Sequence, residues 1–322
     1  MRARWGVLAL VGAVLAVLAG CGAGGGPGGG VSGREPEDGE PRVRTSADVP
    51  ELPLDAYELS DRDNRRMGQA KSRLVQRCMR SYGFADFPLN PRPEPFPKMG
   101  SAFTSTVVSI SPYGTLDLGH ARRWGYGFDP DATFTPKAEG PEGRAVTQRE
   151  YEVLNDFGEA GRTAAVVNGR KVPNGGCTGE SSRRLLGDET KRSRLWAYVD
   201  ERAEEIDKVV AKDPRVRRIF GEWSRCVQDK GYKAYESPRD AFRDKAWRDG
   251  APDGNTARSQ RELGTAVADV ECNRKLNVAG VWWVVSDEEQ RADIRRHAAR
   301  YEAVRADQER LRGTLREVLG EK

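Results

Sequence analysis

Apolar side chains recur at three- and four-residue intervals through the second half of the chain, a spacing that predicts amphipathic helices. One helix is expected from about residue 188 to 211. A second should follow Asp213, a favourable N-cap residue, with Pro214 at its first position. The apolar face of this second helix comprises Val216, Ile219, Phe220, Trp223, Cys226 and Val227.

The end of the chain also has a helical pattern. A third helix is expected over residues 259–280. Ser286 and Glu289 have the spacing of a capping box, which predicts the start of a long last helix that ends near Leu319.

Shorter elements are expected in the first half of the chain. Residues 116–131 predict a short helix followed by an aromatic, glycine-rich turn, and "TQRE" at 147–150 is a capping box for another short helix. The Asn168–Gly169 pair lies between short β-prone runs and predicts a small hairpin within residues 164–177. Its strands are too short to build a sheet-based domain.

One sequence pattern occurs twice, each time at the expected end of a helix. "RCMRSYGF" at 77–84 and "RCVQDKGY" at 225–232 both read Arg, Cys, an apolar residue, three variable positions, Gly and an aromatic residue. Gly83 and Gly231 are placed to end their helices in the left-handed conformation. The chain therefore contains a weak internal repeat.

Four cysteines lie in the body of the chain: Cys78, Cys177, Cys226 and Cys272. Three pairings are possible, and the simplest is one disulfide for each copy of the repeat, Cys78–Cys177 and Cys226–Cys272. Buried free thiols are one alternative. A metal site is another, although the chain has no CxxC or HxxxH spacing. With these bridges, the predicted fold class is mainly α: a disulfide-stapled helical body with a small β-hairpin and long loops, preceded by a disordered linker.

The N-terminal segment joins a basic start to an apolar run and a cysteine. Arg2 and Arg4 precede "VLALVGAVLAVL" at 7–18, which is too short for a comfortable membrane span. The following "LAGC" at 18–21 resembles the bacterial lipobox, in which a diacylglycerol is attached to the cysteine thiol and a signal peptidase cuts just before it. The resemblance implies a signal peptide over 1–20 and a lipidated Cys21 as membrane anchor. An ordinary signal peptide and an uncleaved anchor helix are the alternatives.

Small and polar residues dominate after this cysteine. Residues 21–55 are expected to be the lipidated cysteine and a flexible linker, with a mean reach of about 30 Å. The rest should form two units: a stapled unit of mixed helix, loop and hairpin over 56–186, and a helical unit with a long terminal helix over 187–322.

Charge balance and missing motifs argue against several classes of function. The chain has 53 basic and 49 acidic side chains, a balance that argues against a nucleic-acid partner. It has no P-loop, GxGxxG, HExxH or GxSxG motif, and no alternation of strands and helices of the kind a solute-binding protein needs. We predict no cofactor and no metal, and name no catalytic residue.

The segment "RRWGYGF" at 122–128 is the strongest candidate binding surface. Trp124, Tyr126 and Phe128, separated by glycines, can form an aromatic platform that stacks on sugar rings or anchors an interface. The competing interpretation, which we favour, is that the three rings fill the core.

Two pairs of carboxylates offer weaker chemistry. Asp61 with Asp63, and Asp129 with Asp131, could hold calcium or act as acid and base, but neither pair has the glycine and later glutamate of a calcium loop. Solvated turns and helix starts are the more common roles of such pairs.

Taken as a whole, the chain resembles a group of secreted lipoproteins of high-GC Gram-positive (actinobacterial) type. The shared elements are the lipobox, "RCM…GF" at 77–84, "NGR.VP.GGC" at 168–177 and "ADV.C….N..GVW" at 268–282. This resemblance implies an extracytoplasmic location and disulfide bonds, and it implies no catalytic mechanism.

Two functional hypotheses follow. The first is a non-enzymatic lipoprotein on the outer face of the cell membrane that binds an envelope protein or a cell-wall glycan, with its oligomeric state left open. The second is an enzyme that acts on cell-wall or other polysaccharide through Asp/Glu acid–base chemistry. An enzyme should hold two carboxylates within about 10 Å in a cleft, at least one of them desolvated. A binding module should expose an apolar patch of several hundred Å².

Overall fold

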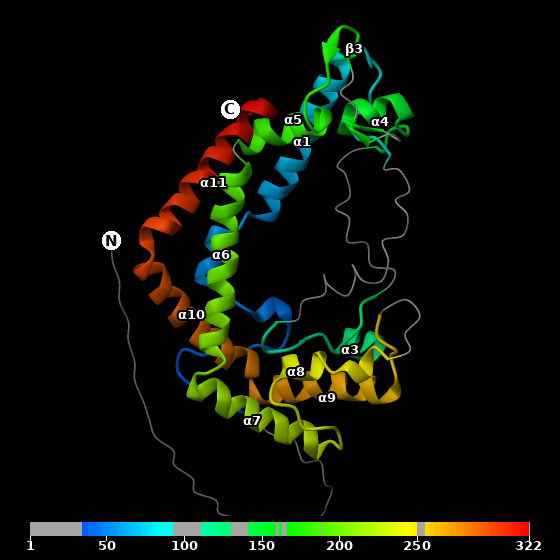
Figure 1. Ribbon diagram of the computed structural model, residues 1–322. Helices are drawn as coiled ribbons and strands as arrows, with labels where there is room; N and C mark the ends of the chain where they lie inside the picture. Colours follow the sequence, from blue (N-terminus) through cyan, green and yellow to red (C-terminus); the bar gives the residue numbers. More distant parts are fainter. Residues whose placement is uncertain are drawn as a thin grey trace, which may run out of the picture. The chain divides into compact units, whose positions relative to one another are not determined.

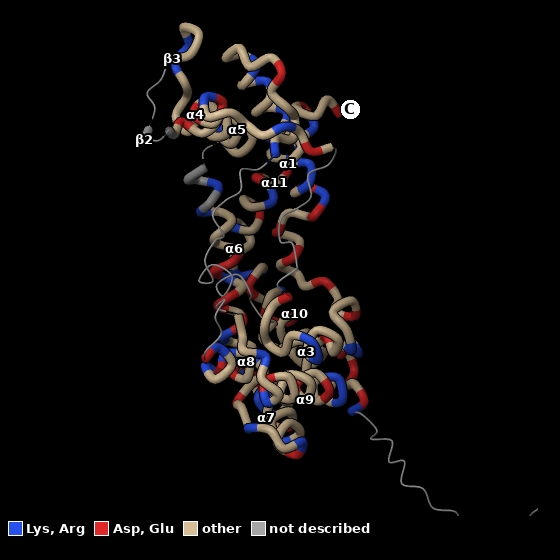
Figure 2. Tube along the Cα trace, turned by 90° about the vertical axis from the view of Figure 1, so that its right-hand side faces the viewer, with Lys and Arg blue, Asp and Glu red and all other residues tan. Residues whose placement is uncertain are grey.

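The structure is a computed structural model that describes residues 34–92, 111–129, 141–158, 161–162, 166–187, 189–249 and 255–321. Within these residues the fold is mainly α, with small antiparallel hairpins (Figure 1). The predicted class of a disulfide-stapled helical body is confirmed. Acidic and basic residues are interspersed along the helices (Figure 2), as the balanced composition predicts.

The elements of the first half are short, apart from one long helix. They are η1 (Ser46–Asp48), η2 (Pro53–Tyr57), α1 (Asp61–Ser81), α3 (Leu118–Trp124), α4 (Gln148–Asn155), β1 (Phe157–Gly158), β2 (Gly161–Arg162), β3 (Val166–Val167), β4 (Arg170–Lys171) and α5 (Gly176–Leu186). The predicted hairpin is β3–β4, and its turn residues Asn168 and Gly169 both have positive φ, of 50° and 76°. The β1–β2 hairpin was not predicted.

The second half is built from longer helices. They are α6 (Glu189–Val210), α7 (Pro214–Asp229), α8 (Pro238–Phe242), η3 (Lys245–Trp247), α9 (Gln260–Leu276), α10 (Val278–Arg296) and α11 (Ala298–Leu319). The start of α7 is as predicted: the Asp213 side chain accepts a hydrogen bond from the Arg215 amide, and Pro214 is the first helical residue.

The repeated sequence produces the same helix end twice. In α1, the amides of Gly83 and Phe84 donate to the carbonyls of Arg80 and Met79. In α7, the amides of Gly231 and Tyr232 donate in the same way to Gln228 and Val227. The two glycines have φ values of 91° and 88°, which completes a Schellman motif at each helix end.

The last three helices are divided differently from the prediction. The helix expected over 259–280 ends at Leu276, and the expected start at Ser286 lies inside α10, where this serine is buried. The first break is at Asn277, whose φ is 56°; its side chain accepts a hydrogen bond from the Val43 amide and donates one to the Pro41 carbonyl. The second break is at His297. Contacts with residues 41–43 hold the turn at Asn277, so local helical patterning could not locate it.

Residues 34–55, the second part of the stretch 21–55 assigned to the lipidated cysteine and a flexible linker, are packed against the helices. The Arg34 amide donates to the Lys275 carbonyl, and the Leu54 amide donates to the Gln290 side chain, each at 2.9 Å. Val43 is completely buried. The linker prediction is therefore corrected for this stretch, because a few apolar side chains and paired backbone groups are enough to order a polar segment.

Hydrophobic clusters cross the predicted boundary between residues 186 and 187. The largest cluster includes Leu54 and Tyr126 together with side chains from α6, α7, α9 and α10. A second joins α1, the end of α5 and α11. A third, around the end of α1, α4, the start of α5 and the β3–β4 hairpin, lies entirely before the boundary. Residues 33–322 group into one unit, so the predicted boundary does not divide the packing.

Candidate functional site

The three rings of the aromatic segment at 122–128 differ in burial: Tyr126 lies in the core, as the favoured interpretation predicts, while Trp124 and Phe128 are half-buried. Tyr126 is only 3% exposed and packs against Trp247 and Phe242, with ring centroids 5.9 Å and 6.0 Å away. Half-buried Trp124 is covered by the guanidinium of Arg258, 5.0 Å from the ring centroid. Tyr126 therefore adds nothing to a binding surface, because its ring is the one most fully removed from solvent.

Phe128, the third member of the candidate platform, is half-buried and held through its backbone. Its amide donates to Asn255 Oδ1 at 3.1 Å, and its carbonyl accepts from Asn255 Nδ2 at 2.9 Å. The segment after α3 is therefore fixed along its length against residues 255–262.

A completely buried carboxylate, Asp269 on α9, lies beneath Tyr126. Its oxygens accept hydrogen bonds from Trp223 Nε1 at 3.0 Å and from the Tyr126 hydroxyl at 3.3 Å. Burial raises the pKa of Asp269 to about 8, while these two hydrogen bonds act in the opposite direction. The sequence held a signal for this group, because Asp269 shares a face of its helix with Ala266 and Cys272, both fully buried.

A second buried carboxylate, Glu262, fixes the turn after α3. It accepts hydrogen bonds from the amides of Tyr126 and Arg258, at 3.1 Å and 2.8 Å. Gly125 has φ of 61°, and a Cβ there would lie 2.7 Å from Glu262 Oε1. Asp269 and Glu262 thus attach residues 125–128 to α9, and both side chains are inaccessible to a ligand.

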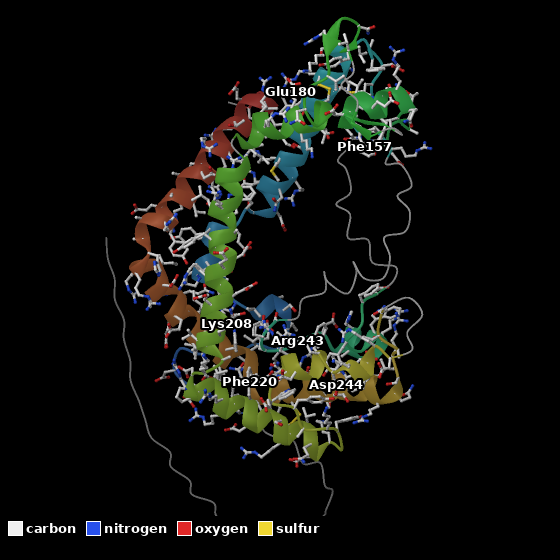
Figure 3. The ribbon with its side chains drawn as sticks, viewed as in Figure 1. Phe157, Glu180, Lys208, Phe220, Arg243 and Asp244 are labelled. Atoms are coloured by element: carbon white, nitrogen blue, oxygen red, sulfur yellow. A yellow bond between two sulfur atoms is a disulfide. The ribbon has the colours of Figure 1, made fainter. Side chains whose placement is uncertain are left out.

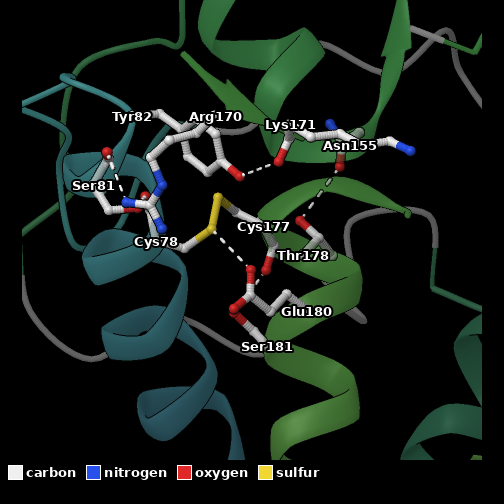
Figure 4. Close-up of a disulfide and its surroundings, with 10 residues drawn as sticks. All are labelled: Cys78, Ser81, Tyr82, Asn155, Arg170, Lys171, Cys177, Thr178, Glu180 and Ser181. Atoms are coloured by element: carbon white, nitrogen blue, oxygen red, sulfur yellow. Dashed lines mark hydrogen bonds between the residues drawn. A yellow bond between two sulfur atoms is a disulfide. The ribbon is translucent and has the colours of Figure 1, made fainter. Parts of the chain in front are cut away.

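The two disulfides are present as predicted. Cys78 on α1 joins Cys177 on α5 (Figure 4), and Cys226 on α7 joins Cys272 on α9. Cys177 and Cys272 are fully buried, so each bridge ties a helix end to the interior.

The other acidic candidates serve structural roles or lie outside the described residues. Asp63 is buried at the start of α1 and pairs with Arg312 at 3.0 Å, while Asp61 lies in the first turn of the same helix. Asp131 is outside the described residues, and Asp129 ends one described range. The described part of the chain contains no group of three or more His, Cys, Asp or Glu side chains that could hold a metal ion.

The predicted lipidation site, Cys21, lies outside the described residues, as does the whole predicted signal peptide. Among the helices that the structure describes, none is both long enough and apolar enough to cross a bilayer.

One cavity is formed by elements that the sequence analysis did not connect. A pocket of about 1180 Å³ is lined by the C-terminal part of α6, by α7, α8 and η3, and by Trp282 of α10. Its apolar lining includes Phe220 and Trp282, whose rings stack with centroids 5.9 Å apart and an interplanar angle of 12°. Figure 3 shows Lys208, Phe220 and Arg243, which come from three different segments of this lining.

Charged side chains of both signs surround these rings. The basic members of the lining are Lys208, Arg217, Arg239, Arg243, Lys245 and Arg248. The acidic members are Glu204, Asp207, Glu236 and Asp240. Six basic and four acidic groups leave a formal excess of two positive charges in the pocket.

The charged groups differ in how they are held. Asp207 Oδ2 lies 3.5 Å from Arg239 Nη2, yet burial still raises the pKa of Asp207. By contrast, the exposed side chains of Lys208, Arg217, Arg243 and Lys245 have no hydrogen-bond or ion-pair partner within the described residues. The pocket therefore presents cations that remain free to contact a ligand, beside a carboxyl group that binds a proton more readily than an exposed one.

Comparison of the chain with known protein families, curated proteins and solved structures gave no match.

Proposed function

We propose that this protein is a lipid-anchored, extracytoplasmic binding protein of the cell envelope, with its ligand site in the α6–α8–α10 pocket. The observation that carries the proposal is a pocket of about 1180 Å³ with unpartnered cations around stacked aromatic rings. Ligand sites are typically concave, partly aromatic and equipped with a few placed polar groups. An envelope glycan or an envelope protein segment are the partners that fit this location.

The location is supported by the lipobox-like "LAGC" and by the two disulfides. Disulfides persist in oxidising compartments outside the cytoplasm, and both bridges here tie helix ends to buried positions. Under this proposal Cys21 is lipidated after residues 1–20 are removed, and the acyl chains hold the protein at the outer face of the membrane.

Packing of residues 34–57 shortens the connection to that membrane. The Arg34 amide is already bound to the Lys275 carbonyl, so only residues 22–33 separate a lipidated Cys21 from the packed part of the chain. Fully extended, such a segment spans about 40 Å. The anchor then keeps the α9–α10 junction within that distance of the bilayer, closer than a linker ending at residue 55 would allow.

The test of this location is the fate of Cys21→Ser. Wild-type protein should sit in the membrane fraction with an acylated N-terminal peptide beginning at Cys21, as found by mass spectrometry. Cys21→Ser should appear in the medium, whereas the matched control Gly25→Ser should stay with the membrane. Membrane retention of Cys21→Ser would contradict the lipid anchor.

The second candidate function is acid–base cleavage of a polysaccharide, and one observation favours it. Burial raises the pKa of Asp207 within a pocket that also contains Glu204 and Asp240. A carboxyl group that stays protonated closer to neutral pH is suited to act as a general acid.

Release of reducing ends from purified cell wall measures this second function. An enzyme of this kind should lose nearly all activity in Asp207→Asn and keep it in Glu201→Gln, an exposed change on the same helix outside the pocket lining. If the wild-type protein releases no more reducing ends than a buffer blank, the enzymatic candidate is wrong and the binding function stands.

A further inference from the structure

The pocket combines three kinds of surface that a single ligand class would use together. Four cations without protein partners, Lys208, Arg217, Arg243 and Lys245, come from α6, α7, the residue after α8, and η3. Arginine and lysine side chains of this kind bind phosphate oxygens, with arginine favoured for paired hydrogen bonds. The positive side of the pocket therefore fits an oxyanion such as a phosphate ester.

The acidic groups indicate that the ligand is more than an anion. Glu204 and Glu236 are exposed members of the lining and make no hydrogen bond or ion pair with the described part of the chain. A carboxylate accepts hydrogen bonds and repels a second anion, so these positions favour the hydroxyl groups of a ligand over its phosphates. A ligand with both phosphates and free hydroxyls satisfies both sets of side chains.

The size of the pocket agrees with such a ligand. A volume of about 1180 Å³ is far larger than a single phosphate needs. The rings of Phe220 and Trp282 border the pocket but are only 7% and 4% exposed, so the charged side chains carry most of the recognition.

We propose that the pocket binds a phosphorylated polyol or carbohydrate, held by Lys208, Arg217, Arg243 and Lys245 through its phosphates and by the lining carboxylates through its hydroxyls. This inference deepens the proposed binding function and depends on it. The same chemistry occurs in a wall polymer of polyol phosphate units and in a glycerol phosphate lipid headgroup, and the experiment separates these two sources.

The experiment measures binding of a short poly(glycerol phosphate) to the full-length secreted chain with Cys21→Ser, by isothermal titration at two salt concentrations. We expect saturable binding to the polymer, with glycerol alone giving none and inorganic phosphate binding at least tenfold more weakly. The double variant Arg217→Ser/Arg243→Ser should weaken polymer binding at least tenfold with an unchanged melting temperature, since both side chains are exposed and unpartnered.

The matched control is Arg225→Ser, which removes an exposed arginine from α7 outside the pocket lining. It should leave affinity within a factor of two of the parent. An equal loss in the control and the double variant would overturn the site, because the attraction would then be a general property of the surface charge.

Two further outcomes distinguish this inference from the function on which it depends. The protein could bind vesicles that contain phosphatidylglycerol and not vesicles of neutral lipid, with no displacement by the free polymer. That result would support the phosphate chemistry and make the headgroup its source. Binding of an uncharged glycan oligomer that is unaffected by Arg217→Ser/Arg243→Ser would overturn the phosphate requirement and leave a binding protein. Absence of binding to every probe would overturn the inference, while the fate of Cys21→Ser still decides the location.

Discussion

The helix ends at Cys78 and at Cys226 have the same local structure in different surroundings. Each has a Schellman motif, a positive-φ glycine and a disulfide to a buried cysteine. The Cys78 region, as we call the surroundings of Cys78–Cys177, consists of the end of α1, α4, the start of α5 and the β3–β4 hairpin, with a small cluster of buried side chains. The Cys226 region, around Cys226–Cys272, consists of α7 and α9 and belongs to the largest hydrophobic cluster.

The same sequence pattern thus produces the same helix end twice, while the packing that supports it differs. In the Cys78 region, much of the support is polar: the Tyr82 hydroxyl donates to the Lys171 carbonyl at 2.7 Å, and Asn168 Nδ2 donates to the Tyr82 carbonyl at 2.6 Å (Figure 4 shows the first). In the Cys226 region, helix α7 buries Trp223 and Val227 completely. We therefore expect the Cys78 region to depend more strongly on its disulfide.

Removing each disulfide tests that expectation most directly. On the chain-entropy model, bridges that close loops of 99 and 46 residues stabilise by roughly 5 and 4 kcal/mol. Cys78→Ala/Cys177→Ala should therefore raise hydrogen exchange strongly in α4 and the β3–β4 hairpin while α7 and α9 stay protected.

Cys226→Ala/Cys272→Ala should instead lower the global denaturation midpoint without selective opening of one region. Hydrogen exchange followed by mass spectrometry separates the two patterns. Equal protection loss throughout the chain in both variants would remove the distinction between the regions.

A buried ion pair outside both regions joins α6 to α11 and to the end of α5, and its loss should nearly match that of a disulfide. Arg192 Nε on α6 donates to Asp307 Oδ2 on α11 at 2.7 Å, and Arg192 Nη1 donates to the Leu185 carbonyl at the end of α5. Asp307→Ala leaves the buried guanidinium unpaired, which should lower the free energy of unfolding by about 3–5 kcal/mol.

The control for this change is Glu309→Ala, which removes an exposed partner of Arg312 and should cost less than about 1 kcal/mol. Urea denaturation measures both values. A cost for Asp307→Ala no greater than that of the control would show that α5, α6 and α11 do not depend on this pair.

The Cys226 region should also respond to pH through Asp269. Because burial raises the folded-state pKa of Asp269 to about 8, the folded protein binds a proton that the unfolded chain releases near pH 4. The stability from this group is therefore fully present below about pH 4, falls by up to about 1.4 kcal/mol per pH unit, and is lost above about pH 8.

Asp269→Asn keeps an acceptor for Trp223 and removes the titration, so its stability should depend less on pH than that of the wild type between pH 5 and 8. Denaturation at a series of pH values gives the two slopes. Parallel slopes for wild type and variant would rule out a raised pKa at Asp269.

The smallest expected difference concerns the two matching glycines. At Gly231 an added Cβ meets nothing within 4 Å. Gly231→Ala should therefore lower the free energy of unfolding only by the cost of placing a Cβ on a left-handed backbone, about 1–2 kcal/mol. At Gly83 a Cβ would lie 2.5 Å from Asn168 Nδ2. Gly83→Ala should therefore cost about 1 kcal/mol more, because the hydrogen bond from Asn168 to the Tyr82 carbonyl is disturbed as well.

Thermal denaturation ranks the two alanine variants, and Gly83→Ala combined with Asn168→Ala provides the cycle that isolates the contact. Equal costs for Gly83→Ala and Gly231→Ala would show that the hairpin does not stabilise the end of α1.

Sequence patterns predicted the features that depend on neighbouring residues. Asp213 caps α7, Thr147 and Glu150 form the capping box of α4, and Asn168–Gly169 makes the hairpin turn. The repeat also suggested one disulfide for each copy, and both pairs are present although their cysteines lie 99 and 46 residues apart. The caps and the turn follow from backbone geometry within a few residues.

Long-range contacts decided what the patterns missed. Residues 34–55 look like a polar linker until the Val43 amide meets Asn277 and the Leu54 amide meets Gln290 on α10. The break at Asn277 exists because residues 41–43 bind its side chain. The pocket combines α6, α7, α8, η3 and α10, and no local spacing connects Lys208, Arg243 and Trp282.

Local patterns in the sequence account for the helical class, the caps and the hairpin turn, since each is encoded by side chains close together along the chain. The repeat suggested the pairing of the cysteines, but the partners lie 99 and 46 residues apart and meet only through tertiary packing. Packing also buries Tyr126 over Asp269, orders the segment before α1 and gathers unpartnered cations around one pocket. Burial and charge pairing depend on which distant surfaces meet, and the free energy of those contacts overrides local composition.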